Sequence, residues 1–241
     1  MKDAWWLGEE EGLLVLNKPP HVVSTGRRLD DPDCFQGRVM AALGRKVWFL
    51  HQLDAPTSGL MLATTRASLV APWQERLRAP RGVKTYIAFC HGRAPRRAFT
   101  VDAALAGQAE PDGWRVRVLP EGREARTDFW TLGELGDACV LAARLRTGRT
   151  HQIRAHLEHV GLQLWGERRY GPAPSDAHTR HALHAFSVGV RETVGGFSWW
   201  EAPCAPDLAA LSEARWGCPA THWEALARAT PWNRALRAEA G

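Results

Sequence analysis

The 241-residue sequence contains few cysteines, and they are not spaced as a disulfide or metal framework. Its five cysteines lie far apart, and no two of them form a Cys-x-x-Cys pair. A small secreted scaffold needs a dense, even set of cysteines, and a cysteine zinc site needs closely spaced pairs. The sequence therefore disfavours both classes and indicates a protein from a reducing compartment.

Long apolar segments are also missing. The N-terminal stretch MKDAWWLGEEEG carries acidic residues where a signal peptide has an apolar segment, and no apolar run approaches the length of a membrane span. We therefore expect a cytoplasmic protein without a membrane partner.

Signatures of cofactor binding are absent from the sequence. No GxGxxG motif follows a predicted strand, and there is no GxxxxGK motif of the NTP-binding loops. Two groups of histidines have short spacings, but neither has the carboxylates or cysteines that would complete a metal site. The groups are His151, His156 and His159, and His178, His181 and His184. We expect no metal, no nucleotide and no other cofactor.

Positive charge is in excess, and most of it is arginine. Lys and Arg outnumber Asp and Glu by 31 to 26, which gives a net charge of +5. Arginine binds phosphates through parallel hydrogen bonds and stacks on bases, so the excess favours a nucleic acid over a membrane surface as partner. A genome rich in G and C would produce part of the same bias. The remaining composition, with 45% hydrophobic and 24% charged residues, is typical of a folded globular protein.

Apolar and β-branched residues mark a series of short strands with few helices between them. The expected strands are residues 12–20, 59–64, 84–92, 114–119, 125–132, 138–145 and 182–190. The expected helices are residues 34–44, residues 67–78 as a kinked or late-starting helix interrupted by Pro72, residues 150–161 with Thr150 as cap and Gly161 as end, and residues 206–237. The irregular connections and the lack of a linker favour one α+β domain over residues 1–241, built on a mixed sheet. Three tryptophans are expected to pack the tail on the body, namely Trp216, Trp223 and Trp232.

The first candidate functional segment is HQLDAPTSGLMLAT, residues 51–64. Asp54 lies in its turn-forming part, directly before an apolar run suited to a buried strand, so a rigid element would present the carboxylate. A single Asp at such a position is also explained by an Asx turn, which needs no function.

The second candidate segment is RTGRTHQIRAH, residues 146–156. Arg146, Arg149 and Arg154 surround an expected helix start, and a helix N-terminus with arginines beside it is suited to bind phosphate. Taken alone, such a run also fits a solvated basic face.

Together with KTYIAFCHG, residues 84–92, these segments resemble the signature motifs of the RluA family of pseudouridine synthases. The family's HRLDxxTSGLLL corresponds to HQLDAPTSGLML, its KxYxAxxxG to KTYIAFCHG, and its TGRTHQIRxHLxxxG to TGRTHQIRAHLEHVG. Weaker similarity lies in VLNKPP, ARTDFWTL, GERRYG and LHAFSVGV, and the matches follow the family order from about residue 12 to residue 203. The resemblance implies the pseudouridine synthase fold, a mixed, largely antiparallel sheet flanked by helices and loops. Residues 204–241 would form a helical tail packed on this domain.

The resemblance also implies an activity, the isomerisation of specific uridines in structured RNA. This reaction moves the bond between sugar and base from N1 to C5 of uracil, so it is redox-neutral and needs no cofactor. By resemblance, Asp54 is the catalytic carboxylate, Tyr86 stacks on the target base and Arg154 is the ion-pair partner of Asp54. An arginine beside a carboxylate favours its ionised form, and an aromatic platform offsets part of the cost of unstacking a base. The expected RNA-binding residues are His51, Gln52, Thr57, Lys84, Arg146, Arg149, Thr150, His151 and Gln152.

The expected partner is ribosomal or transfer RNA, bound by a monomer. Gln52 departs from the family pattern because it replaces an arginine, and GLQLWGE at residues 161–167 replaces GHPLxGD. No S4-like domain precedes the motifs, so the chain resembles the compact subgroup. Because of Gln52, the alternative is an RNA-binding paralogue without activity, which the joint presence of Asp54, Tyr86 and Arg154 disfavours. A glycoside hydrolase fits less well because Asp54 has no second acid in a recognisable motif.

Overall fold

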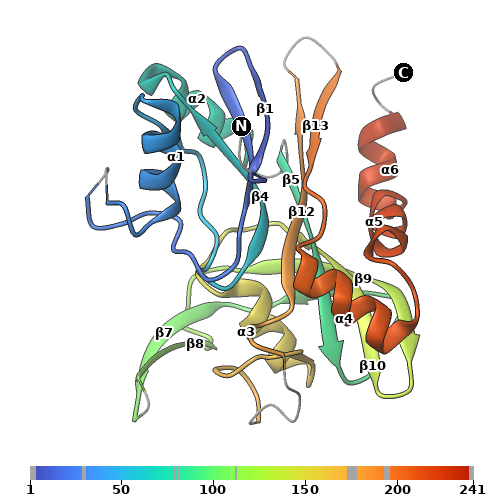
Figure 1. The fold of residues 1–241 in the computed structure, drawn as a ribbon. Helices are drawn as coiled ribbons and strands as arrows, with labels where there is room; N and C mark the ends of the chain where they lie inside the picture. The colour runs from blue at the N-terminus through green and yellow to red at the C-terminus, as the bar shows by residue number, and fades with distance from the viewer. Residues whose placement is uncertain are drawn as a thin grey trace.

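The computed structural model describes residues 4–28, 31–78, 80, 82–111, 113–172, 178–192 and 196–238. Within these residues, eleven strands form one mixed sheet, two more form a separate hairpin, and six α-helices flank the sheet (Figure 1). The predicted α+β class is therefore confirmed. The last three residues of the expected tail, 239–241, lie outside the described residues.

The large sheet has the strand order β1-β2-β4-β12-β5-β10-β9-β6, with β3 beside β4, β11 beside β5 and β13 beside β12. The pair of β12 and β4 is parallel, and the other described pairs are antiparallel. The strands of this sheet are β1 (Trp6–Glu10), β2 (Leu13–Lys18), β3 (Trp48–Phe49), β4 (Ser58–Thr64), β5 (Gly82–His91), β6 (Ala98–Asp102), β9 (Arg126–Leu135), β10 (Ala138–Leu145), β11 (Gln163–Leu164), β12 (Leu183–Arg191) and β13 (Phe197–Glu201). The hairpin consists of β7 (Leu105–Glu110) and β8 (Gly113–Val118). The helices are α1 (Phe35–Leu43), α2 (Val70–Arg76), α3 (Gln152–His159), α4 (Pro206–Trp216), α5 (Ala220–Arg228) and α6 (Pro231–Ala238), with a 3-10 turn, η1 (Ala67–Leu69), before α2.

The parallel pair brings the segments that precede β4 and β12 to the same end of the sheet. His184 lies opposite Ser58, and Ala185 lies opposite Gly59. Gly59 is required at this close approach, because its φ is 116° and a Cβ would lie 2.2 Å from the carbonyl oxygen of Ala185. The turn that carries Asp54 therefore lies beside the segment that leads into β12.

Strand β5 separates two packed faces, because successive side chains of a strand point in opposite directions. Tyr86 and Ala88 belong to a core cluster on one face, to which α1 and α3 contribute Phe35 and Ile153. Ile87 belongs to a cluster on the other face, together with residues of α4 and α5. The candidate site lies on the face of Tyr86.

The C-terminal helices cover the face opposite the candidate site (Figure 1). Trp223 is 4% exposed and packs in the same cluster as Phe89, and the ring centroid of Trp216 lies 5.4 Å from that of Phe89. Trp232 donates from Nε1 to the hydroxyl oxygen of Thr85 at 3.2 Å. Tryptophans thus join each of the three helices to the sheet.

The expected strands and helices are confirmed, with ends that differ by a few residues and with the tail divided into three helices. The predicted cap of α3 is wrong. Its N-cap is His151, with a left-handed φ of 52°, and Thr150 is exposed. This conformation directs the His151 side chain into the candidate site, so a tertiary contact decides the helix start. The edge strands β1, β6 and β13 were not predicted from the sequence. No helix in the described ranges is both long and apolar enough to cross a membrane.

Candidate active site

Asp54 lies in a tight turn that leads into β4. Thr57 donates its backbone N–H to the carbonyl oxygen of Asp54 at 3.0 Å, which closes the turn. The hydroxyl oxygen of Thr57 lies 2.8 Å from Nε2 of His181, and both side chains are buried. The turn is therefore fixed by its own backbone and by the segment before β12.

Two buried cations bind consecutive carbonyl groups of this turn. Lys18, the last residue of β2, donates from Nζ to the carbonyl oxygen of Ala55 at 3.0 Å, and to two carbonyls of the following loop. Arg180 donates from Nη1 to the carbonyl oxygen of Pro56 at 2.9 Å. Burial, and then Arg180, lower the pKa of Lys18 from 10.5 to about 7, while Asp54 opposes the shift. The backbone beside Asp54 is thus held from two sides.

Arg180 also joins this turn to the C-terminal helices. Its side chain is fully buried, and Asp207 in the first turn of α4 accepts from its Nε at 2.6 Å and from its Nη2 at 3.0 Å. The same Nη2 donates to Oγ of Ser58 at 3.0 Å. Asp207, in the C-terminal tail, therefore balances the positive charge of Arg180, whose hydrogen bond holds the turn of Asp54.

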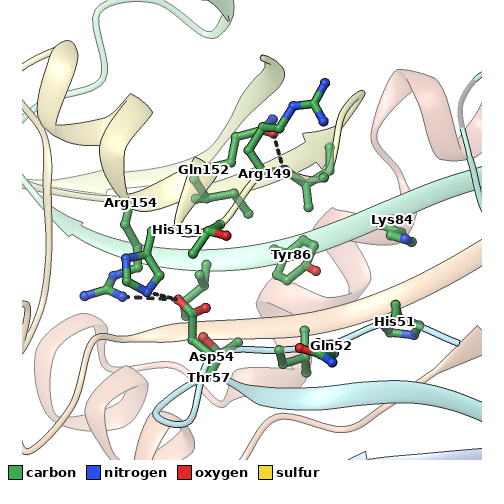
Figure 2. A pocket seen from close by; sticks show the side chains of 16 residues that line it. His51, Gln52, Asp54, Thr57, Lys84, Tyr86, Arg149, His151, Gln152 and Arg154 are labelled. Atoms are coloured by element: carbon green, nitrogen blue, oxygen red, sulfur yellow. Dashed lines mark hydrogen bonds and ion pairs between the residues drawn. The ribbon is translucent and has the colours of Figure 1, made fainter. Parts of the chain in front are cut away.

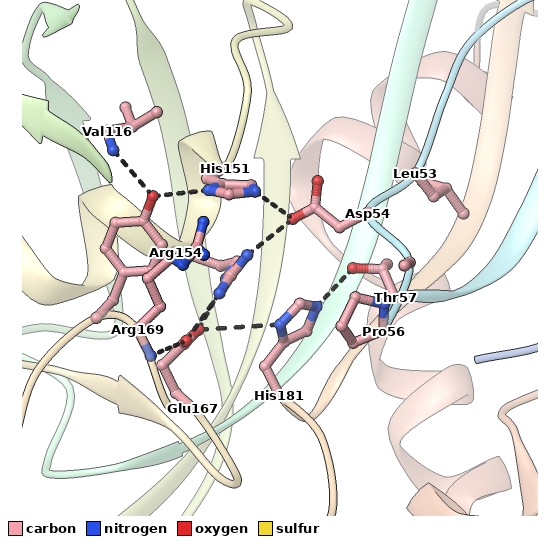
Figure 3. Close-up of polar contacts among 12 residues, drawn as sticks. Leu53, Asp54, Pro56, Thr57, Val116, His151, Arg154, Glu167, Arg169 and His181 are labelled. Atoms are coloured by element: carbon pink, nitrogen blue, oxygen red, sulfur yellow. Dashed lines mark hydrogen bonds and ion pairs between the residues drawn. The ribbon is translucent and has the colours of Figure 1, made fainter. Parts of the chain in front are cut away.

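The carboxylate of Asp54 faces a buried arginine (Figure 3). Nη1 of Arg154, in the first turn of α3, lies 3.1 Å from Oδ2 of Asp54. Glu167 accepts two hydrogen bonds of 2.7 and 2.8 Å from the other nitrogens of the guanidinium. The side chains of Arg154 and Glu167 are 8% and 2% exposed, whereas that of Asp54 is 25% exposed. Glu167 thus fixes the direction in which Arg154 presents Nη1.

His151 and Tyr170 lie beside the same carboxylate. Nε2 of His151 lies 3.7 Å from Oδ2 of Asp54, and its Nδ1 lies 2.7 Å from the hydroxyl oxygen of Tyr170. That hydroxyl accepts the backbone N–H of Val116 at 3.2 Å, so it donates its proton to the histidine. Burial lowers the pKa of His151 more than the charge of Asp54 raises it, and these partners assign the ring proton to Nε2. Among the described residues both contacts fall on Oδ2, which leaves Oδ1 of Asp54 available to a bound molecule.

A pocket of about 410 Å³ opens beside Asp54 (Figure 2). Tyr86 lies between Asp54 and Lys84 in this view, and it is 7% exposed. Burial, and then Asp54, raise the pKa of the Tyr86 phenol, so the hydroxyl keeps its proton. Burial, and then Arg78, lower the pKa of Lys84 from 10.5 to about 8. The residues predicted to bind RNA that line this pocket are His51, Gln52, Thr57, Lys84, Arg149, Thr150, His151 and Gln152.

One rim of the pocket, formed by His51 and Gln52, brings no positive charge. Nε2 of His51 accepts the backbone N–H of Leu62 at 3.0 Å. Burial, and then Lys84, lower the pKa of His51 from 6.5 to about 3, so its ring is neutral. Gln52 is exposed and donates from Nε2 to the hydroxyl oxygen of Thr25 at 3.1 Å.

Two other side chains that were predicted to bind RNA, Gln152 and Arg146, form hydrogen bonds within the protein. The buried amide of Gln152 donates to the backbone of β9 and accepts the N–H of Arg149 at 3.0 Å, so it shapes the loop before α3. Arg146 donates to Asp128 at 2.6 Å. It lies outside the pocket, in an adjoining groove of about 530 Å³ that Lys84 and Arg149 also line.

Several residues of the site were not predicted. Lys18, Glu167 and Tyr170 lie in VLNKPP, GLQLWGE and GERRYG, so the similarity of these segments to the family was the available signal. Arg180 had no such signal, because its role depends on contacts between distant segments.

The histidines have structural partners. Nδ1 of His184 lies 3.0 Å from Oγ of Ser58, and its Nε2 lies 3.1 Å from the carbonyl oxygen of Ala202. His156 has a similar pair of contacts, to Thr127 and to a backbone carbonyl. Over the described ranges, no three His, Cys, Asp or Glu residues are grouped to hold a metal ion.

Comparison with known proteins gives a family for this arrangement. Residues 12–159 match the model of the family described as RNA pseudouridylate synthase. The chain belongs to this family. It is 38% identical to an uncharacterized RNA pseudouridine synthase of Chloroflexus aurantiacus over 161 residues, which cover 66% of this chain and 50% of that protein. It is 33% identical to the ribosomal large subunit pseudouridine synthase C of Pasteurella multocida, with 76% of this chain and 58% of that protein covered.

A third relative, the uncharacterized RNA pseudouridine synthase YlyB of Bacillus subtilis, is 32% identical over 85% of this chain and 70% of its own length. The matches thus span from half to seven tenths of these relatives. Among solved structures, human RNA pseudouridylate synthase domain containing 4 has a TM-score of 0.68 at 18% identity, with 92% of each chain covered. Human RNA pseudouridylate synthase domain containing 1 has a TM-score of 0.66 at 22% identity, with 85% of this chain and 86% of that chain covered. These structures show that the pseudouridine synthase fold is shared.

We predict that Asp207→Asn destabilises the protein, because the substitution leaves the buried Arg180 guanidinium without a counter-charge. Removing one partner of such a pair is expected to cost roughly 3 kcal/mol. Chemical denaturation gives the free energy of unfolding. Asp137→Asn is the matched control, because Asp137 pairs with Arg215 at the other end of the same helix but is 85% exposed. Equal stability of Asp207→Asn and Asp137→Asn would contradict this role of Asp207.

Proposed function

We propose that the protein isomerises specific uridines to pseudouridine in structured RNA, with Asp54 as the catalytic carboxylate. One observation carries the proposal. Asp54, Tyr86 and Arg154 come from three segments far apart in the sequence, and the fold gathers them around one pocket. The family of the chain supports the same reaction.

The reaction requires a reactive carboxylate and no outside reagent. The bond between N1 of uracil and C1′ of ribose breaks, the base turns, and a bond from C5 to C1′ forms. The proton on C5 leaves and N1 gains a proton, so atoms and electrons balance within the nucleotide. Oδ1 of Asp54 faces the pocket free of the contacts that bind Oδ2, and it acts as nucleophile or as base.

The neighbours of Asp54 hold its carboxylate in position for this reaction. Arg154 donates to the carboxylate, and the bidentate contact with Glu167 holds Arg154 in place. The neutral His151 ring directs an N–H towards the carboxylate without adding a second full charge. This arrangement orients the carboxylate of Asp54 while its exposed side meets the substrate.

Tyr86 and the basic residues beyond it supply the contacts to the nucleotide. The ring of Tyr86 offers a stacking surface for a base that has left its helix. Lys84 and Arg149 lie between the pocket and the adjoining groove of Arg146, where they can contact phosphates. Since one relative is named for the ribosomal large subunit, ribosomal RNA is the first substrate to test, followed by transfer RNA. The alternative of an inactive RNA-binding paralogue is disfavoured because the contacts of Asp54 are intact.

The purified protein is expected to form pseudouridine in unmodified ribosomal or transfer RNA transcripts without added metal or nucleotide, and chelator is expected to have no effect. Asp54→Asn should abolish this activity and leave the dissociation constant for RNA within a few-fold, because it removes the charge and keeps the shape. Chemical mapping of pseudouridine and filter binding measure the two quantities. RNA binding without conversion at any uridine by the wild-type protein would instead support the inactive paralogue.

Two substitutions of Tyr86 separate the ring from the hydroxyl. If stacking is its main contribution, Tyr86→Phe should lower the single-turnover rate much less than Tyr86→Ala, which loses a contact worth about 1–3 kcal/mol. Rates are measured with enzyme in excess over a transcript that the wild-type protein modifies. Equal losses in both variants would show that the hydroxyl is the essential group.

RNA affinity is expected to fall as the pH rises through 8, because the pKa of Lys84 is about 8 in the free protein. A bound phosphate raises the pKa of an ammonium group, so binding above pH 8 must take up a proton. A rise of one unit would weaken binding about fivefold between about pH 7 and about pH 9. Lys84→Arg keeps its charge and should show a flatter profile. Parallel profiles for the two proteins would show that Lys84 does not contact a phosphate.

A further inference from the structure

A second groove begins where the pocket ends. Its volume is about 550 Å³, and it shares Asp54, His151 and Arg154 with the pocket. Its other walls include the loop at residues 166–169 and Arg115 of β8. The proposed reaction uses only the pocket side of Asp54. When a target base enters the pocket, however, the nucleotides next to it must lie on the surface beside this carboxylate.

The outer walls of this groove are basic. Arg115, Arg168 and Arg169 line it. Arg168 is exposed and has no ion-pair partner in the part of the chain that the structure describes. The acidic groups of the groove, Asp54 and Glu167, are already held in ion pairs. Arg115 pairs with Glu110 at 3.2 Å, so the uncompensated positive charge that the groove offers to phosphates is that of Arg168.

Trp114 is the second residue of β8 and directly precedes Arg115, which lines this groove. Its side chain is 50% exposed, and its ring lies over Gly107, where a Cβ would lie 2.2 Å from the ring. Its carbonyl oxygen accepts from Nη1 of Arg169 at 3.3 Å. Its ring centroid lies 6.5 Å from that of His151, which in turn approaches Asp54. Through the contact with Arg169, a partly exposed aromatic residue adjoins the wall of the groove formed by Arg115 and Arg169.

Stabilisation of the hairpin does not account for all of this arrangement. An aromatic side chain that covers a glycine stabilises a sheet, and Trp114 does so. That role uses one side of the ring and leaves half of a large apolar side chain in water, which is unfavourable. Exposed rings beside arginines are the elements that bind single-stranded nucleic acid, because a base stacks on the ring while the arginines contact phosphates.

We propose that this groove binds unpaired nucleotides next to the target uridine, with Trp114 stacking on a base and with Arg168 and Arg169 contacting phosphates. The inference rests on the proposed function, because it assumes an RNA whose flipped uridine enters the pocket. Every base has a face that can stack, so this subsite selects single-stranded RNA and not a particular base.

The test is binding of a fluorescent oligouridylate of about 12 residues, and of a duplex RNA of equal length, at several salt concentrations. Trp114→Ala should weaken oligouridylate binding about tenfold without changing the salt dependence, and Trp114→Phe should retain most of the affinity. Arg168→Gln should reduce the slope of log K against log salt by about 0.7. Leu135→Ala is the matched control, because Leu135 is also 50% exposed and belongs to β9, outside the β7–β8 hairpin.

Wild-type affinity in both Trp114→Ala and Arg168→Gln would overturn the inference, and so would an equal loss of duplex and single-strand binding in Trp114→Ala. Circular dichroism monitors the fold, and Trp114→Phe keeps a ring over Gly107 if the alanine variant unfolds.

The two proposals can be contradicted independently of each other. A wild-type protein that forms no pseudouridine, together with weak oligouridylate binding by Trp114→Ala, contradicts only the reaction. Pseudouridine formation with unchanged oligouridylate binding by both variants contradicts only the groove.

Discussion

The buried charge of Arg154 is the constraint on which the arrangement of the site depends. A buried guanidinium that loses one partner costs about 3–5 kcal/mol, so its acceptors are held as firmly as the arginine itself. Glu167 accepts from two of its nitrogens and Asp54 from the third. Because both carboxylates bind the same guanidinium, α3, the loop after β11 and the turn before β4 are fixed relative to one another. Glu167 is almost fully buried, whereas Asp54 is partly exposed, so Asp54 is the partner whose interactions can change during a reaction.

The same physical requirement holds the backbone of the turn that carries Asp54. Carbonyl groups at the end of a sheet have no ladder partner, and unpaired buried carbonyls are unfavourable. Lys18 and Arg180 supply donors to two consecutive carbonyls, but each brings a positive charge that must itself be compensated. Asp207 compensates Arg180 from the C-terminal helices. The position of Asp54 therefore depends on an N-terminal strand and on a C-terminal helix that packs against the opposite face of the sheet.

Local signals predicted most elements of the fold, and motif similarity predicted the central residues of the site. The helix at residues 34–44 was predicted by its apolar spacing and its closing glycine, and α1 ends at this glycine as expected. Physical reasoning on single segments did not distinguish Asp54 from an ordinary Asx turn, and the similarity of three motifs made that distinction. The contacts of Arg180 were not predictable, because they require the parallel pairing of β4 and β12, which strand patterns do not reveal. For Glu167, the similarity of its segment to the family was the only signal. The cap at Thr150 was predicted wrongly because tertiary contacts of His151 override the local preference.

Positive charge is distributed unevenly around Asp54, and for the proposed RNA substrate this distribution is compatible with glutamine at position 52, where the resembled motif has arginine. The rim formed by His51 and Gln52 is neutral, because burial keeps the imidazole uncharged and the amide is bonded to Thr25. On the other side of Asp54, the loop at residues 166–169 places arginines along an open groove. A strand of RNA that crosses both sides needs phosphate contacts along its length but not at every nucleotide. In the proposed complex, arginines beyond Asp54 hold the strand while the neutral rim admits the uncharged base, so binding does not depend on an arginine at position 52.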